Sequence, residues 1–147
     1  MGRYHDLVTI LAELRARYCP RRDDVEIMWG RRSGRVRQRS IRLGVYQPEN
    51  RRIRIHPALD QAFVPRYFVE FIVYHELLHH LIPAVRVNGR FQIHSATFRA
   101  QERAFPDYVA AIAWRKRHLR LLLDSAESRA IAARPGARGP WTWTGGR

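Results

Sequence analysis

The sequence has one cysteine and one lysine among its 147 residues. The single cysteine, Cys19, excludes an internal disulfide and any metal site built from several thiolates. Acidic residues are also few, with 13 Asp and Glu against 27 Lys and Arg, so the formal net charge is +14. Because Lys116 is the only lysine, arginine carries nearly all of this charge, and its planar guanidinium suits phosphate well.

A long, uninterrupted apolar run is also missing. The most apolar segment, residues 65–82, contains Glu70, His75 and Glu76 and is therefore too polar to span a membrane. The N-terminus has no apolar core of the kind that a signal peptide needs. These features predict a protein of the reducing cytoplasm, with Cys19 as a half-buried thiol and no membrane partner.

Length and patterning predict one folded domain of the α+β class. We expect this domain to cover residues 1–131, followed by a flexible tail rich in Pro, Gly and Arg over residues 132–147, which contains Trp141 and Trp143. Hydrophobic periodicity predicts an N-terminal helix, a three-stranded antiparallel sheet and then three helices. The expected helices are residues 4–18, 65–82, a segment from Ser95 and residues 107–126; the expected strands are residues 25–29, 41–45 and 52–55. In the last strand, Ile53 and Ile55 should face the core.

The most informative segment is His75-Glu76-Leu77-Leu78-His79, which reads H-E-x-x-H inside the predicted helix 65–82. Two histidines four residues apart lie on one helical face, so both imidazoles can reach one ion. Glu76 can lean toward that ion without binding it and accept a proton from water that the ion activates. Without a metal, burying these polar side chains in such an apolar helix would be costly.

A third ligand is expected beyond Pro83, which ends the helix. An Asn88-Gly89 turn reverses the chain and leads to His94, and Ser95 is a good N-cap for the next helix. Three protein ligands leave one coordination position for water, which is the open arrangement of a catalytic zinc site. Of the other histidines, His80 points about 100° away from His79 around the helix, which suits a packing or supporting role. We interpret the last three, His5, His56 and His118, as ordinary residues.

Together these segments resemble the SprT-like family of small zincin metallopeptidases and related bacterial metal-dependent hydrolases. The resemblance covers residues 25–119 and is carried by Ile41-Arg42-Leu43-Gly44, Arg52-Ile53-Arg54-Ile55, Leu59, Val64-Pro65, the H-E-x-x-H segment, His94-Ser95-x-x-Phe98 and Phe105-Pro106-Asp107-Tyr108. It implies a minigluzincin-like zincin fold in which His75, His79 and His94 bind one Zn²⁺ and Glu76 is the general base. Many SprT-like proteins also carry a Cys-rich zinc-binding module, which this sequence lacks.

Two functions are therefore weighed. The first is a zinc metallopeptidase that acts on proteins or peptides, with DNA-associated proteins as one substrate class and with Tyr108, Tyr74 or a nearby arginine stabilising the oxyanion. The second is a basic nucleic-acid-binding module that keeps a zincin scaffold without peptidase activity. Hydrolysis of a non-peptide bond stays open as well. Glu76 favours an enzyme, because a purely structural metal site has no use for a base beside its ligands. The basic residues gather in two clusters: Arg31, Arg32, Arg35, Arg37, Arg39, Arg42, Arg51, Arg52 and Arg54, and then Arg115, Lys116, Arg117 and Arg120.

Overall fold

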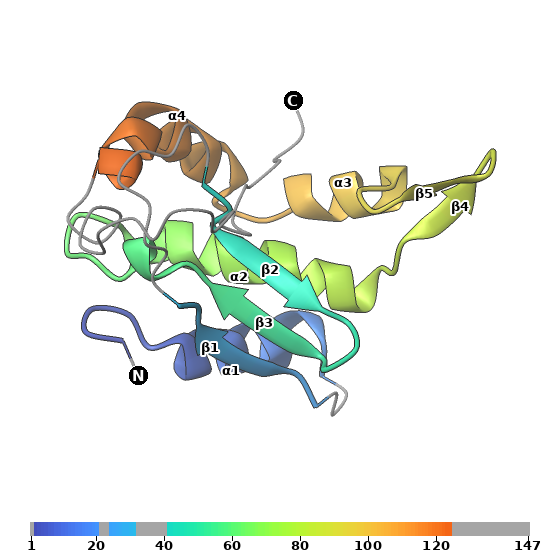
Figure 1. Ribbon diagram of the computed structural model, residues 1–147, viewed down its shortest axis with the longest axis horizontal. Coiled ribbons are helices and arrows are strands. Elements are labelled where there is room, and N and C mark those ends of the chain that lie inside the picture. The colour runs from blue at the N-terminus through green and yellow to red at the C-terminus, as the bar shows by residue number, and fades with distance from the viewer. Residues whose placement is uncertain (1, 21–23, 32–40, 125–147) are drawn as a thin grey trace, which may run out of the picture.

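The computed structural model of the chain describes residues 2–20, 24–31 and 41–124 and has the predicted α+β class (Figure 1). Its helices are α1 (Leu7–Tyr18), α2 (Arg66–Leu81), α3 (Ala96–Arg103) and α4 (Tyr108–Asp124), with a 3₁₀ turn η1 (Pro57–Leu59). Its strands are β1 (Glu26–Trp29), β2 (Gly44–Gln47), β3 (Arg52–Ile55), β4 (Val85–Val87) and β5 (Arg90–Gln92). The expected tail 132–147, the domain boundary at residue 131 and the last two residues of the predicted final helix lie outside the described residues. So do four of the nine arginines of the first basic cluster, Arg32, Arg35, Arg37 and Arg39.

The main sheet is mixed, so the prediction of an antiparallel sheet is wrong for its first strand. The order is β1-β3-β2, with β2 antiparallel and β1 parallel to β3. Strand β3 is central, and its Ile53 and Ile55 are fully buried, as predicted. The turn at residues 48–51 forces β2 and β3 to be antiparallel, whereas β1 reaches β3 only across the intervening chain. Nothing local to β1 therefore sets its direction.

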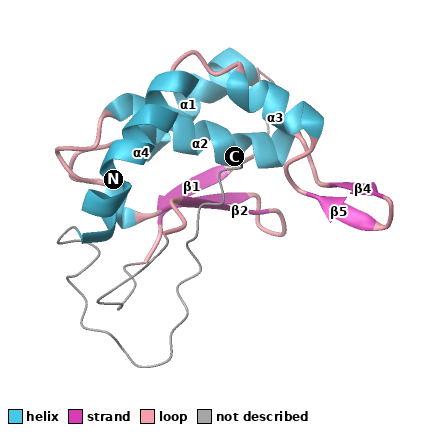
Figure 2. Cartoon of the chain, turned by 90° about the horizontal axis from the view of Figure 1, so that it is seen from above, coloured by secondary structure: helices cyan, strands magenta, loops and turns pink. Residues whose placement is uncertain are grey.

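Helix α2 is the centre of the domain. It contacts α1, α3 and α4 and also packs on β2 and β3, while Figure 2 shows the helices gathered on one side of the sheet. Every residue from Phe71 to Leu78 is buried, which explains why the apolar residues cover most of its circumference. No helix within the described ranges has both the length and the apolar character needed to cross a membrane.

Local hydrogen bonds decide where the helices begin. The predicted first helix starts at Leu7 rather than Tyr4, because the backbone N–H groups of Arg3, Tyr4 and His5 donate to the carboxylate of Asp60 at 2.6–3.0 Å. Asp6 then caps α1 by accepting from the N–H groups of Val8 and Thr9. The predicted N-cap of α3 is confirmed, since Ser95 Oγ accepts from the N–H of Phe98.

The segment predicted as a turn after α2 is a two-stranded hairpin, β4–β5. Asn88 and Gly89 have positive φ values of 50° and 75°, and two adjacent residues in this region form the tight turn that matches the twist of a hairpin. The hairpin projects beyond the C-terminal end of α2 (Figures 1 and 2). It leads directly into His94 and the cap of α3.

Candidate metal centre

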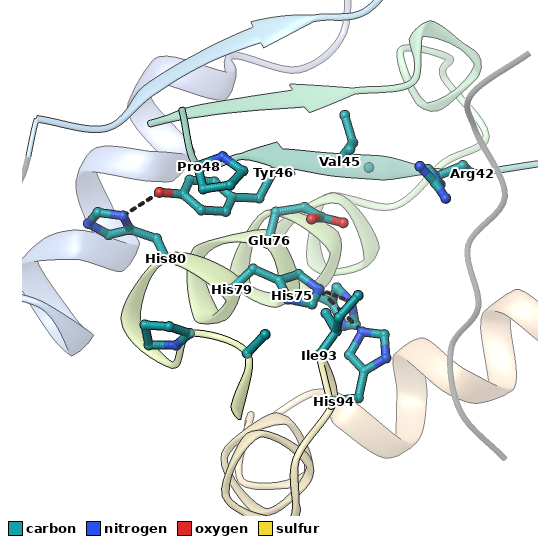
Figure 3. Close-up of a pocket in the computed structure, with 13 residues that line it drawn as sticks. Arg42, Val45, Tyr46, Pro48, His75, Glu76, His79, His80, Ile93 and His94 are labelled. Carbon is teal, nitrogen blue, oxygen red and sulfur yellow. Dashed lines mark hydrogen bonds between the residues drawn. The ribbon is translucent and has the colours of Figure 1, made fainter. Parts of the chain in front are cut away.

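Three histidines converge at the C-terminal half of α2 (Figure 3). His75 and His79 come from α2, and His94 comes from the segment that joins β5 to α3. The Nε2 atoms of His75 and His79 are 3.2 Å apart, and those of His79 and His94 are also 3.2 Å apart. Nitrogen atoms of all three lie within 4.8 Å of one another, so the structure brings together the three predicted ligands.

The donor set fits a tetrahedral zinc ion. Zinc–nitrogen bonds of roughly 2.0–2.1 Å at tetrahedral angles place two ligand nitrogens about 3.3–3.4 Å apart. Two of the three nitrogen pairs, His75–His79 and His79–His94, have separations of 3.2 Å, which is close to that value. Burial lowers the pKa of His79 to about 3 and also lowers the pKa of His94. Both rings are therefore neutral at pH 7, which is the form that binds a metal.

Glu102 on α3 orients the first of these histidines. Its Oε2 lies 3.0 Å from His75 Nδ1, and both side chains are almost fully buried. A histidine whose Nδ1–H donates to a carboxylate keeps the lone pair of Nε2 for another partner, and here Nε2 of His75 lies 3.2 Å from Nε2 of His79. Such a carboxylate partner fixes the tautomer of a metal-binding histidine and raises its basicity.

The ring of Phe98 packs against all three imidazoles. Its ring is fully buried, and its centroid lies 5.1 Å, 4.6 Å and 4.9 Å from those of His75, His79 and His94. Contact with one aromatic ring restricts all three imidazole orientations at once. The site is thus held in place by packing before any ion enters it.

Glu76 lies beside the histidines and is not one of the converging ligands. Its side chain is 3% exposed, and its carboxylate accepts a hydrogen bond from the backbone N–H of Tyr46 on β2. Burial raises the pKa of Glu76 to about 7, although His75 and Arg42 act in the opposite direction. Figure 3 shows Glu76 beneath β2, with its carboxylate directed toward the Arg42 side of the cleft.

Gly44 provides the space that Glu76 occupies. A Cβ atom at Gly44 would lie 2.8 Å from both Cγ and Oε1 of Glu76 and 3.1 Å from Cγ2 of Ile72. Atoms cannot approach so closely, so a larger residue at this position must displace the carboxylate. The first residue of β2 therefore determines where the candidate base sits.

We predict that Gly44→Ala retains metal but loses most hydrolytic activity, because the methyl group moves the Glu76 carboxylate. A displacement of about 1 Å in a catalytic group can cost on the order of 10²-fold in rate. Metal content and hydrolysis rate measured on the same sample test this. Gln47→Ala, on the same strand but not a lining residue of the cleft, is the control for a change in the strand itself. Wild-type activity in Gly44→Ala would show that the position of Glu76 is not important.

These residues border an open cleft of about 490 Å³ between α2, β2 and the base of the hairpin. Its lining comprises Arg42, Gly44, Val45, Tyr46, Pro48, His75, Glu76, His79, His80, Pro83, Ala84, Ile93 and His94. The predicted oxyanion-stabilising residues Tyr74 and Tyr108 are not among them. The Tyr74 hydroxyl donates to the carbonyl of Gln101 at 2.7 Å, and Tyr108 packs on Phe71. Arg42 is the arginine among the lining residues of the cleft.

Three of the four remaining histidines, His56, His80 and His118, have other hydrogen-bond partners. His80 lines the cleft, and its Nδ1 lies 2.7 Å from the Tyr46 hydroxyl, consistent with a supporting role. His56 Nδ1 accepts from the N–H of Ala58, and burial lowers the pKa of His56 to about 4. His118 Nδ1 lies 3.0 Å from the carbonyl oxygen of Trp114. None of these three belongs to the converging group.

Sequence reasoning missed Glu102 and the supporting role of Phe98. A signal was present, because Phe98 and Glu102 follow Ser95 at helical spacing and lie on one face of α3. Comparisons with protein-family models, with curated proteins and with solved structures gave no match to this chain.

Proposed function

We propose that this chain is a zinc-dependent metallopeptidase with a SprT-like zincin fold. The observation that carries the proposal is the convergence of His75, His79 and His94 next to a buried carboxylate that is not one of them. When bound, zinc lowers the pKa of water to about 7 and polarises a carbonyl group. A structural metal would not require Glu76, whose burial is costly.

Residues of this chain would transfer the protons and orient the histidine ligands. Glu76 accepts a proton from the attacking water and delivers it to the leaving amine. Glu102 keeps the proton of His75 on Nδ1, so that Nε2 is available as a ligand. Arg42 lines the same cleft and is our candidate for stabilising the negative charge that develops on the scissile carbonyl oxygen.

The position of strand β2 favours a polypeptide as the substrate. It is an edge strand of the sheet, and its Gly44, Val45 and Tyr46 line the cleft beside the histidines. An edge strand can bind an extended peptide through backbone hydrogen bonds, and alternate side chains of the peptide then point into the cleft. A peptide bound this way would pass directly in front of Glu76.

Nucleic-acid binding is a second candidate, favoured by the net charge of +14. Lys116 and Arg117 are exposed on α4, whereas Arg52 on the sheet is paired with Glu26 at 2.9 Å. A positive surface attracts polyanions without reading their sequence. In combination with the metal centre, this charge would favour protein substrates that are bound to DNA.

The proposal predicts that gently purified protein contains about one zinc per chain, the number that one three-histidine site can hold. It also predicts that the protein cleaves an unfolded test protein such as reduced, carboxymethylated α-lactalbumin. A chelator should abolish cleavage, and added zinc should restore it, because metal binding to histidines is reversible. Elemental analysis and gel-based cleavage assays measure both. Cleavage that survives complete metal removal, or a zinc-loaded protein that cleaves no peptide, would refute the assignment.

A further inference from the structure

The β4–β5 hairpin exposes an unusual amount of apolar surface. All residues from Pro83 to Ile93 are exposed. Of the ten large hydrophobic side chains that are exposed within the described ranges, four lie in this hairpin: Val85 (43%), Val87 (41%), Phe91 (66%) and Ile93 (57%). Exposed apolar side chains that gather in one element mark a candidate interaction surface. Val85 and Val87 lie on one face of this hairpin and Phe91 lies on the other, because side chains alternate along a strand. An isolated two-stranded hairpin is also only marginally stable, so a partner would stabilise it.

One face of the hairpin continues into the metal cleft. The register pairs Arg86 with Phe91, and the Arg86 guanidinium lies 4.7 Å from the centroid of the Phe91 ring. Ala84 directly precedes β4 and Ile93 directly follows β5, so the two residues join the strands of this pair to the rest of the chain. Both Ala84 and Ile93 line the cleft. We call the four residues Ala84, Arg86, Phe91 and Ile93 the hairpin face.

We propose that the hairpin face binds a bulky apolar side chain of an unfolded polypeptide substrate, about three residues from the bond that is cut. This inference rests on the proposed peptidase function. We infer a polypeptide substrate because the hairpin face adjoins the metal cleft. A substrate chain that passes the histidines reaches Ile93 and then Phe91. Phe91 is three residues from His94, which is at most about 10 Å of chain and so no more than about three extended substrate residues. Folded proteins bury such side chains, so the substrate class is unfolded or locally unfolded protein.

The test compares Phe91→Ser with Val109→Ser, both made in zinc-loaded Glu76→Gln protein so that the bound polypeptide is not consumed. Val109 is 79% exposed on α4 and is not a lining residue of the cleft. Fluorescence anisotropy measures the binding of labelled, reduced, carboxymethylated α-lactalbumin. Loss of one aromatic contact should weaken binding about tenfold, or about 1.4 kcal/mol, in Phe91→Ser. Val109→Ser should bind like its parent, and the zinc content should be equal in all three proteins.

A second arm uses the active chain and maps its cleavage sites by mass spectrometry. Large apolar residues should be enriched about three positions from the cut, and Phe91→Ser should lose this preference. Equal affinities of Phe91→Ser and Val109→Ser would overturn the inference. A dimer or a vesicle-bound form that Phe91→Ser abolishes would overturn it too, by assigning the face to a second copy or to lipid. Binding that depends on Phe91 without any cleavage would support the docking surface and refute the peptidase function. Cleavage that does not depend on Phe91 would support the peptidase function and refute the docking surface.

Discussion

Glu76→Gln is expected to abolish peptide hydrolysis while the fold and the bound zinc stay in place. Glutamine has nearly the same shape but cannot accept a proton from water, and loss of a general base costs about 10²–10⁴-fold in rate. The side chain is 3% exposed and does not belong to the converging ligands, so the metal should be retained. Because burial disfavours a charged carboxylate, the melting temperature should be unchanged or higher. Turnover, zinc content and thermal unfolding measure the three parts separately.

Glu70→Gln is the matched control for this variant. It makes the same substitution on the same helix, but Glu70 is paired with Arg66 at 2.6 Å and is not a lining residue of the cleft. The control should keep wild-type turnover. Its free energy of unfolding should fall by no more than an exposed ion pair contributes, about 0–1 kcal/mol. Near-normal turnover in Glu76→Gln would show that Glu76 is not the general base. Loss of zinc from Glu76→Gln would mean that the carboxylate helps to hold the ion.

The parts of the fold that the sequence predicts well are those set by local chemistry. The Asn88-Gly89 turn and the Ser95 cap each depend on a few adjacent residues, and both were found where expected. The alternation of Ile53 and Ile55 likewise identified the buried face of β3. The parallel direction of β1 was missed because it depends on how two distant segments meet. The start of α1 was missed for the same reason, since Asp60 holds the preceding N–H groups.

Some residues of the candidate site can likewise be predicted from local sequence, whereas others are brought there only by tertiary packing. The four-residue spacing alone places His75 and His79 on one face of α2, and the observed 3.2 Å separation of their Nε2 atoms agrees with it. Glu102 is 27 residues from His75, so the contact between them is decided by the packing of α3 on α2. Gly44 carries no side chain to interpret, and its importance appears only once β2 lies over Glu76. Sequence therefore identifies the reactive groups, and tertiary packing supplies the residues that position them.

His94→Ala is expected to lose zinc affinity by several kcal/mol, on the order of 10³-fold. Zinc sites in small domains bind with roughly 10–16 kcal/mol in total, and this substitution removes one of three protein ligands. His94 is half-buried and lies outside α2, so its removal leaves the helix intact and the His75–Glu102 contact unchanged. Competition with a zinc chelator of known affinity measures the loss directly.

His80→Ala is the control that separates the role of a ligand from that of any histidine in the cleft. His80 follows His79 directly and lines the same cleft, but its Nδ1 contacts the Tyr46 hydroxyl and not the other imidazoles. We therefore expect its removal to change zinc affinity by less than about tenfold, which is below the roughly 10–100-fold loss typical of residues that hydrogen-bond directly to a metal ligand. Unchanged affinity in His94→Ala would place the third ligand elsewhere. Equal losses in both variants would mean that the shape of the cleft, rather than the three converging nitrogens, determines binding.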